Sequence, residues 1–234
     1  MDRTVPPVVG IVTGLRFEAE LLHAAAQRHG EAPLISIAGL GAGRAAQAAR
    51  LLVRQGATHL LSFGLAAGLD PALKPGMTVV ATGVQGINGV QFCDGAWAAR
   101  LAAAMQAQLG TVAHAAAIAA TVADKAHLAA AGAIAADMES AGVLEVAVTT
   151  KRPAAVLRVI SDTADQALPS AALLAMDNNG NLRPGLAVAA IIGAPWELPA
   201  MIRLGLSTRV ARKRLTELAG LGLGRSFFAQ LGDE

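Results

Sequence analysis

The stretch VVGIVTGLRFEAELLHAAAQRHG, residues 8–30, shows the pattern on which the fold is built. It opens with Val, Ile and Thr and reaches Gly14, which is typical of a buried strand. Residues 16–30 then read as a helix that ends in a glycine cap. A buried strand followed at once by a helix is the repeating unit of α/β proteins.

The same alternation continues along the chain. Further strands are predicted at 34–39, 58–64, 77–83 and 154–162, and further helices at 43–56, 97–110, 123–132 and 138–150. Continuous apolar strands separated by helices indicate an α/β sheet covered on both faces. The chain shows neither an internal repeat nor a linker. We therefore expect residues 1–234 to form one domain, with an apolar and then basic helical region at about 181–225.

Composition bounds the class of protein. Of the 234 residues, 54% are hydrophobic and 15% charged, and the large apolar residues are mainly aliphatic, which favours a sizeable core. Cys93 is the only cysteine, so an internal disulfide is excluded and a reducing compartment is expected. The five histidines lack the spacing of metal ligands, so no metal site is predicted.

The N-terminus and the charge distribution bound location and partners. Asp2 and two prolines precede the first apolar run, which is unlike a signal peptide, and the apolar stretch 184–196 is too short to span a bilayer. The net charge is only +2, with most of the excess beyond position 203. A general nucleic-acid binder would need a broad basic face. We expect a cytoplasmic protein that does not bind nucleic acid.

Two glycine-rich segments follow predicted strands. GLGAG (39–43) resembles part of a dinucleotide fingerprint, but the third glycine would fall at Arg44 and no acid lies between Glu31 and Asp70. A nicotinamide cofactor is therefore not predicted. The segment is either a tight turn or a place where backbone amides near Gly41 face an anion. FGLAAGL (63–69) permits either close backbone packing or a floor for a ligand.

Three acids follow predicted strands. Glu18 comes just after the first strand, Glu139 lies in IAADMESAGVLEVA (134–147), and Asp162 ends AVLRVISD (155–162). Ligands of open α/β sheets bind outside the carboxyl ends of the strands, so these acids predict a functional rim. Asp137 and Asp165 are expected instead to be ordinary acids, Asp137 as the cap of a helix that starts at Met138.

At this point the chain resembles a known group. GIVTGLRFEAELL, GLGAG, FGLAAGLDPALKPGMTVV, AADMESAGVLEVA and LRVISDTADQ occur in the order seen in the nucleoside phosphorylase and methylthioadenosine/S-adenosylhomocysteine nucleosidase superfamily. The resemblance covers residues 8–170. It implies a three-layer α/β/α fold with a mixed central sheet, cleavage of the N-glycosidic bond of an adenosine derivative with release of adenine, no cofactor, and a homodimer.

The resemblance also implies roles for individual residues. Glu139 would grip the ribose hydroxyls, with Met138 packed on the ribose. Asp162 would protonate the purine, and Glu18 would orient and deprotonate the attacking water. These roles are chemically reasonable, because a carboxylate bound to the sugar hydroxyls stabilises the positive charge that develops on the ribose. The further substrate contacts implied by the matching segments are Ser161, Gly64, Ala66 and His127.

Departures from the group leave the nucleophile open. The hydrolases often carry a hydroxyl residue and a glycine pair where this chain has Leu65 and Ala67. The ADKAHL segment lacks the aromatic residue that often stacks on the purine, for which His127, Phe63 or Phe92 could substitute. Glu18 favours water, whereas Arg16, Arg44 and the amide of Gly41 could hold phosphate.

The tail narrows the expected substrate. The lysine of ADKAHL and the segment DNNGNLRPGLAVAAIIGAPWELPAMIRLG most resemble the hopanoid-biosynthesis-associated phosphorylases, which implies adenosylhopane as the substrate and ribosylhopane or phosphoribosylhopane as the product. Residues 196–215 then run from apolar to basic, which predicts contact with the inner membrane surface. The alternatives are a methylthioadenosine/S-adenosylhomocysteine nucleosidase and a non-catalytic nucleoside- or lipid-binding protein.

Overall fold

The computed structural model describes residues 7–30, 33–87, 89–175, 183–224 and 227–228. The strands are β1 (Val9–Thr13), β2 (Leu34–Ile37), β3 (His59–Gly68), β4 (Thr78–Gly86), β5 (Gly89–Phe92), β6 (Gln108–His114), β7 (Ala135–Asp137) and β8 (Ala154–Asp162). The helices are α1 (Arg16–His29), α2 (Ala42–Arg54), α3 (Gly95–Met105), α4 (Val122–Ala129), α5 (Ser140–Thr150), α6 (Ser170–Ala175), α7 (Pro184–Gly193), the short 3-10 helix η1 (Pro195–Glu197) and α8 (Leu198–Gly220).

The central sheet is mixed, as predicted. Strands β2, β1, β3 and β8 are parallel neighbours, and β4 pairs with β8 in the antiparallel sense. On its other edge β4 pairs in parallel with β6, and β6 in parallel with β7. Because β7 returns to pair with the end of β3, the five strands β3, β8, β4, β6 and β7 close into a ring.

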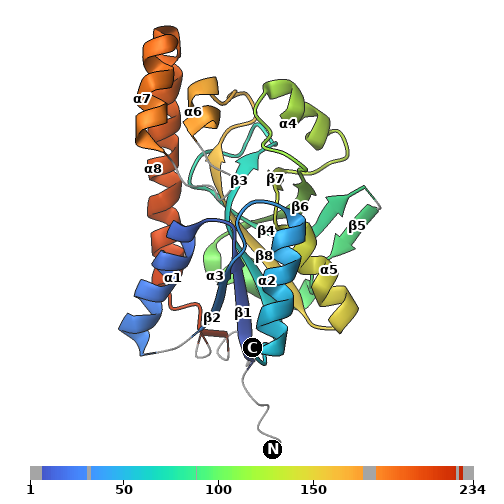
Figure 1. Cartoon of the computed structure of the whole chain (residues 1–234). Coiled ribbons are helices and arrows are strands. Elements are labelled where there is room, and N and C mark those ends of the chain that lie inside the picture. Colours follow the sequence, from blue (N-terminus) through green and yellow to red (C-terminus); the bar gives the residue numbers. More distant parts are fainter. Residues whose placement is uncertain (1–6, 31–32, 88, 176–182, 225–226, 229–234) are drawn as a thin grey trace, which may run out of the picture.

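Helices cover both sides of this sheet. α1 and α8 pack together on one side, and α2 and α5 pack together on the other (Figure 1). The strands between them are almost wholly apolar, and Ile11, Leu61 and Leu157 are fully buried. Burial on both faces explains why these strands read as continuous apolar runs rather than as alternating ones.

Several predicted boundaries were wrong. The strand predicted at 58–64 continues to Gly68, because FGLAAG extends the ladder with β8. The helix predicted at 97–110 ends at Met105, where Gln106 takes a left-handed conformation and β6 follows. The strands β5, β6 and β7 were not predicted: β5 and β7 have only four and three residues, and the start of β6 falls within the helix predicted at 97–110. The helix predicted from Met138 begins two residues later, at Ser140.

The C-terminal helices form one wall beside the sheet. α8 starts beyond the end of the sheet at which β1 and β3 finish, and it runs back along α1 (Figure 1). Glu197 fixes the start of this helix, because its carboxylate accepts hydrogen bonds from the hydroxyl of Ser170 (2.6 Å) and the amide of Ala171 (3.0 Å) in α6. Within the described ranges, no helix has the length and apolar character needed to cross a membrane.

Candidate active site

A cavity of about 930 Å³ opens where β1, β3 and β8 end. Its floor is formed by residues that follow these strands, together with Asp137, Met138 and Glu139 after β7. Of the predicted site residues, those that line it are Glu18, Arg16, Gly64, Ala66, Met138, Glu139, Ser161 and Asp162. The three acids predicted at the rim are therefore brought together.

Glu18 lies at the bottom of the cavity and is buried. Its carboxylate accepts hydrogen bonds from the backbone amides of Leu15 (2.9 Å) and Leu65 (3.0 Å). Burial raises the pKa of Glu18 above its ordinary value, although these amides and the charge of Arg158 oppose the rise. A carboxylate with a raised pKa is a better acceptor of protons near neutral pH.

Glu139 lies between two glycine-containing turns. Its carboxylate accepts a hydrogen bond from the amide of Gly41 (3.2 Å), and a Cβ at position 14 would be 3.1 Å from its carboxyl carbon. Gly14 thus allows the acid to approach the first strand closely. Burial, and after it the charge of Asp137, raises the pKa of Glu139 to about 7. Gly41 therefore serves this carboxylate with its backbone amide.

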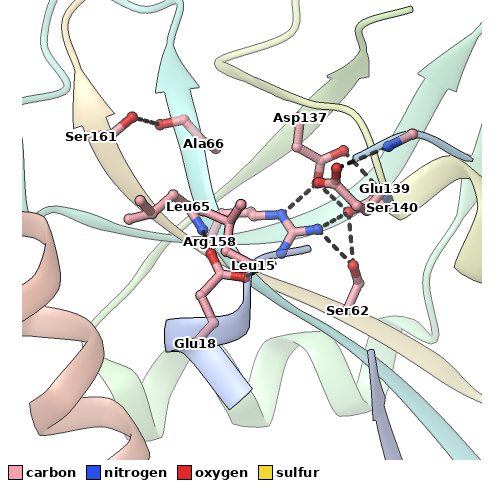
Figure 2. Close-up of polar contacts among 11 residues, drawn as sticks. Leu15, Glu18, Ser62, Leu65, Ala66, Asp137, Glu139, Ser140, Arg158 and Ser161 are labelled. Carbon is pink, nitrogen blue, oxygen red and sulfur yellow. Dashed lines mark hydrogen bonds and ion pairs between the residues drawn. The ribbon is translucent and has the colours of Figure 1, made fainter. Parts of the chain in front are cut away.

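Arg158 is the main site residue that the sequence analysis missed. It is fully buried in β8, and its guanidinium donates hydrogen bonds to the carboxylate of Asp137 and to the hydroxyls of Ser62 (2.6 Å) and Ser140 (2.9 Å) (Figure 2). Burial disfavours its charge, but Asp137, Glu139 and Glu18 outweigh that effect and raise the pKa of Arg158. The guanidinium thus partly neutralises the acids around the cavity.

The prediction that Asp137 is an ordinary helix cap was wrong. Asp137 does accept a hydrogen bond from the amide of Ser140 (3.1 Å), the first residue of α5, but it is buried and forms an ion pair with Arg158. A buried charge without a partner would be very costly, so the pair explains why an acid and a base stand in two otherwise apolar segments.

Asp162 is held from two sides. The hydroxyl of Ser161 donates to its carboxylate. The same hydroxyl lies 3.2 Å from the carbonyl oxygen of Ala66 (Figure 2). On the far side, the ammonium of Lys125 in α4 forms a buried ion pair with the same carboxylate. Asp162 lines the cavity, whereas Lys125 lies behind it. Lys125 is the second site residue that the sequence analysis did not identify by its role.

Other predicted contacts lie elsewhere. His127 is exposed on α4 and does not line the cavity. Phe63 is fully buried in the core and Phe92 is exposed on β5, so neither could stack on a purine in this cavity. Arg44 lies exposed in the first turn of α2, away from the cavity lining. Of the two arginines proposed for phosphate, only Arg16 borders the cavity.

Much of the remaining lining is apolar, and α8 contributes to it together with the polar residues Thr208, Arg209 and Arg212. Its apolar part includes Ile118, Leu168, Leu173, Met201 and Leu204. Gly205 faces the same space, and no atom lies within 4 Å of the position that its Cβ would take. Arg212 of α8 covers the ring of Phe17, 4.7 Å from its centre, which links this wall to α1. The cavity thus combines a group of acids with a large apolar wall that also carries two arginines of α8.

Comparison with solved structures identifies the fold. A methylthioadenosine/S-adenosylhomocysteine nucleosidase from Colwellia psychrerythraea, solved with adenine, has a TM-score of 0.67 at 18% identity, over 97% of this chain and 96% of that one. An S-adenosylhomocysteine nucleosidase from Streptococcus pyogenes has a TM-score of 0.64 at 18% identity, over 94% of this chain and 99% of that one. The futalosine hydrolase of Helicobacter pylori has a TM-score of 0.65 at 16% identity, over 96% of this chain and 97% of that one.

The sequence itself gives an independent assignment. No functionally curated protein matches the chain by sequence. The family model described as the Phosphorylase superfamily matches residues 10–193, which include all of the strands except the first residue of β1, and also the three acids predicted for the site. This span is well over half of the 234 residues. The fold and the matched span agree, and the chain belongs to the Phosphorylase superfamily.

Proposed function

We propose that this protein hydrolyses the N-glycosidic bond of an adenosine derivative and releases adenine. The observation that carries the proposal is that Glu18, Glu139 and Asp162 line one cavity, each held by a different set of partners. The related structures from Colwellia psychrerythraea and Streptococcus pyogenes are nucleosidases, the first solved with adenine and the second with 5-methylthiotubericidin.

The three acids divide the reaction among them. Asp162 gives a proton to the purine as the bond electrons move onto adenine. The ribosyl cation that remains is stabilised by Glu139, which accepts hydrogen bonds from the sugar hydroxyls most strongly when the charge is present. Water then attacks the cation, and its proton passes to Glu18, whose pKa is raised by burial. Met138 lies beside Glu139 in the lining and packs against the ribose.

The position of Glu18 favours water over phosphate as the nucleophile. Its carboxylate already accepts hydrogen bonds from the backbone amides of Leu15 and Leu65. These amides are therefore not available to a phosphate bound beside them. A phosphate placed beside Glu18 and Glu139 would meet two acids at close range, which is unfavourable. Arg16 borders the cavity but is exposed to solvent, so it compensates this repulsion only weakly. The guanidinium of Arg158 already donates hydrogen bonds to Asp137, Ser62 and Ser140, so fewer of its donors remain for a phosphate.

The apolar end of the cavity favours a substrate with a large hydrocarbon group, and adenosylhopane is the substrate proposed. The cavity volume of about 930 Å³ is near the top of the range of roughly 300–1,000 Å³ found for ligand pockets. Leu173, Met201 and Leu204 would surround the tail, while the acids hold the nucleoside. A methylthioadenosine/S-adenosylhomocysteine nucleosidase is the second candidate, because its smaller substrate would fill only the acidic end.

A substrate with such a tail resides in membranes, and α8 offers a surface for meeting one. Leu198, Ile202, Leu206 and Val210, here called the α8 ridge, recur every four residues and are all more than 40% exposed. Lys213 lies two turns beyond Leu206 on the same face of the helix. An apolar stripe that leads into basic residues is typical of helices that bind at a membrane interface. We therefore propose that residues 196–215 make peripheral contact with the inner membrane.

The test is incubation with adenosylhopane and with methylthioadenosine, each with and without inorganic phosphate, followed by mass analysis of the products. We expect adenine and ribosylhopane, with no phosphorylated product when phosphate is present. Asp162→Asn should reduce kcat by ~10²–10⁴-fold, the usual contribution of general acid catalysis. A phosphorylated sugar would overturn hydrolysis. Failure to release adenine from either compound would favour a non-catalytic nucleoside- or lipid-binding protein.

A further inference from the structure

Lys125 makes an unusual set of contacts for a lysine. Its side chain is only 1% exposed, although it belongs to the otherwise largely exposed helix α4. The ammonium donates hydrogen bonds to the carboxylate of Asp162 and to the carbonyl oxygens of Thr163 (2.7 Å) and Gln166 (2.7 Å). An ammonium has three protons to donate, so these three acceptors satisfy it completely.

This arrangement has a clear direction. The ammonium reaches Asp162 from behind, since Lys125 does not line the cavity and Asp162 does. One carboxylate oxygen of Asp162 is thereby taken by the lysine, and the other accepts from Ser161. The carboxylate cannot rotate without breaking one of these contacts. Desolvating an ammonium is costly, and a neutral side chain packed in the same place would avoid that cost, so stability alone does not account for the lysine.

We propose that Lys125 is a positioning residue for the reaction, which fixes the orientation of Asp162 and tunes its strength as an acid. A positive charge in contact stabilises the carboxylate that forms when a carboxyl group gives up its proton, so Lys125 would assist transfer of the proton to the purine. No proton needs to leave Lys125 itself. The inference rests on the proposed function, because it concerns the acid of that reaction.

Other charges near this pair are few and differently placed. Asp165, on the loop after β8, is exposed, and its pKa is lowered first by the hydroxyl of Thr163 and only weakly by the charges of Lys74 and Lys125. Glu18 lines the same cavity from the first turn of α1, and Glu139 lines it from the N-cap of α5; burial raises the pKa of each. Replacing Lys125 therefore removes the one cation that contacts Asp162 among the described residues.

The experiment is the pH profile of kcat/KM with methylthioadenosine for the wild type, Lys125→Met and Lys125→Arg. Without the ammonium the charge beside the acid is lost, and the pH optimum should move upward by on the order of one unit. The peak value should also fall at least tenfold, because the acid is less well oriented. Lys125→Arg keeps the charge and should keep the optimum. Lys74→Met, which removes an exposed lysine nearby, is the matched control.

The outcomes separate the two proposals. If the wild type releases no adenine from any adenosine derivative, the proposed function fails. If the wild type is active and Lys125→Met loses activity equally at every pH, Lys125 only holds the loop together and the inference is overturned. Should Lys125→Met not fold, Lys125→Gln replaces it, since glutamine keeps a donor without the charge. Failure of both neutral variants to fold, with Lys125→Arg folded, would assign the lysine to folding alone and would also overturn the inference.

Discussion

The carboxylate of Glu18 lies directly against the backbone of Gly64. A Cβ at position 64 would be only 2.6 Å from one carboxylate oxygen of Glu18, far inside normal contact distance. Position 64 must therefore be glycine for the acid to reach the amide of Leu65 next to it. The segment around Gly64 was expected to pack closely or to lie beneath a ligand, and Gly64 in fact makes room for the carboxylate of Glu18.

Gly64→Ala should therefore displace Glu18 without unfolding the protein. The new methyl group would push the carboxylate off the amides of Leu15 and Leu65, and we expect kcat/KM to fall by about 10²-fold, as for other general bases moved from their place. Gly86→Ala in β4 is the control, because no atom lies within 4 Å of its added Cβ. Steady-state kinetics, together with circular dichroism of both variants, would check this. Equal activity of the two variants would contradict the seating of Glu18.

Glu139 should make the empty protein less stable as the pH rises. Its pKa is about 7 in the folded protein against an ordinary value of 4.5, so the folded state binds the proton more tightly than the unfolded chain. The stability that this adds is fully present below pH 4.5 and is lost as the pH rises through 7. Glu18, whose pKa is also raised, acts in the same direction.

Urea unfolding at pH 5 and pH 8 would measure this effect. Relative to the wild type, Glu139→Gln should gain up to about 3 kcal/mol between the two pH values, since each unit of pKa shift corresponds to ~1.4 kcal/mol. Glu145→Gln, which changes an exposed acid on α5, should show no such gain. A difference between Glu139→Gln and the wild type that did not change with pH would contradict the raised pKa of Glu139.

A site residue could be predicted from the sequence only where the local pattern of strands and helices indicated its position. Glu18 and Asp162 directly follow or end strongly apolar strands, so their place at the rim followed from the strand–helix alternation, and β8 has the predicted bounds. Arg158 lies inside that same strand, and it was taken simply as part of the strand. The signal was present nevertheless, because a lone arginine in an apolar run needs a buried acid, and Asp137 was available.

The missing strands had no comparable signal. β7 has only three residues, Ala-Ala-Asp, and it exists because its neighbours β3 and β6 close the ring around it. Such pairing depends on contacts far apart in the sequence, which local propensity cannot report. His127 was misplaced for a related reason. Its segment is a helix, as predicted, but it is Lys125 of this helix, two residues earlier, that turns inward.

Gly205 should control which substrates fit. It lies in α8 at the apolar end of the cavity with open space beside it, although glycine weakens the interior of a helix by about 1 kcal/mol relative to alanine. Gly205→Leu should stabilise the helix and fill that space. We expect kcat/KM to fall at least ~10-fold for adenosine derivatives with a long 5′ hydrocarbon group, and methylthioadenosine cleavage to change less than about twofold.

The control is Gly193→Leu in α7, which also has open space beside it but does not line the cavity. Kinetics with a series of 5′-alkylthioadenosines of increasing chain length would show the length at which Gly205→Leu and the wild type diverge. If both substrate classes were affected alike, the apolar end would not hold the 5′ group, and the proposal of a hydrocarbon tail would lose its structural support.

The α8 ridge should bind anionic membranes through two separable contributions. Its apolar side chains enter the interface, and each basic residue beside it contributes about 1 kcal/mol near an anionic surface. Not every basic residue of α8 is available for this. Arg214 is partly buried and donates to the carbonyl of Met105 (2.8 Å), and Arg212 covers Phe17, so both serve the fold. Arg203 and Lys213 are exposed and are the residues to change.

We therefore expect the wild type to sediment with phosphatidylserine-containing liposomes in low salt and to be released as salt is added. Arg203→Ser/Lys213→Ser should weaken binding mainly at low salt, whereas Ile202→Ser/Leu206→Ser should weaken it at every salt concentration. Arg28→Ser/Arg54→Ser, which removes two exposed charges at the ends of α1 and α2, should bind like the wild type. All three variants should still cleave methylthioadenosine, because none of the altered residues lines the cavity. If the wild type does not bind at low salt, or if the ridge variants bind as well as the control, α8 has no membrane role. A soluble thioadenosine would then become the better substrate proposal.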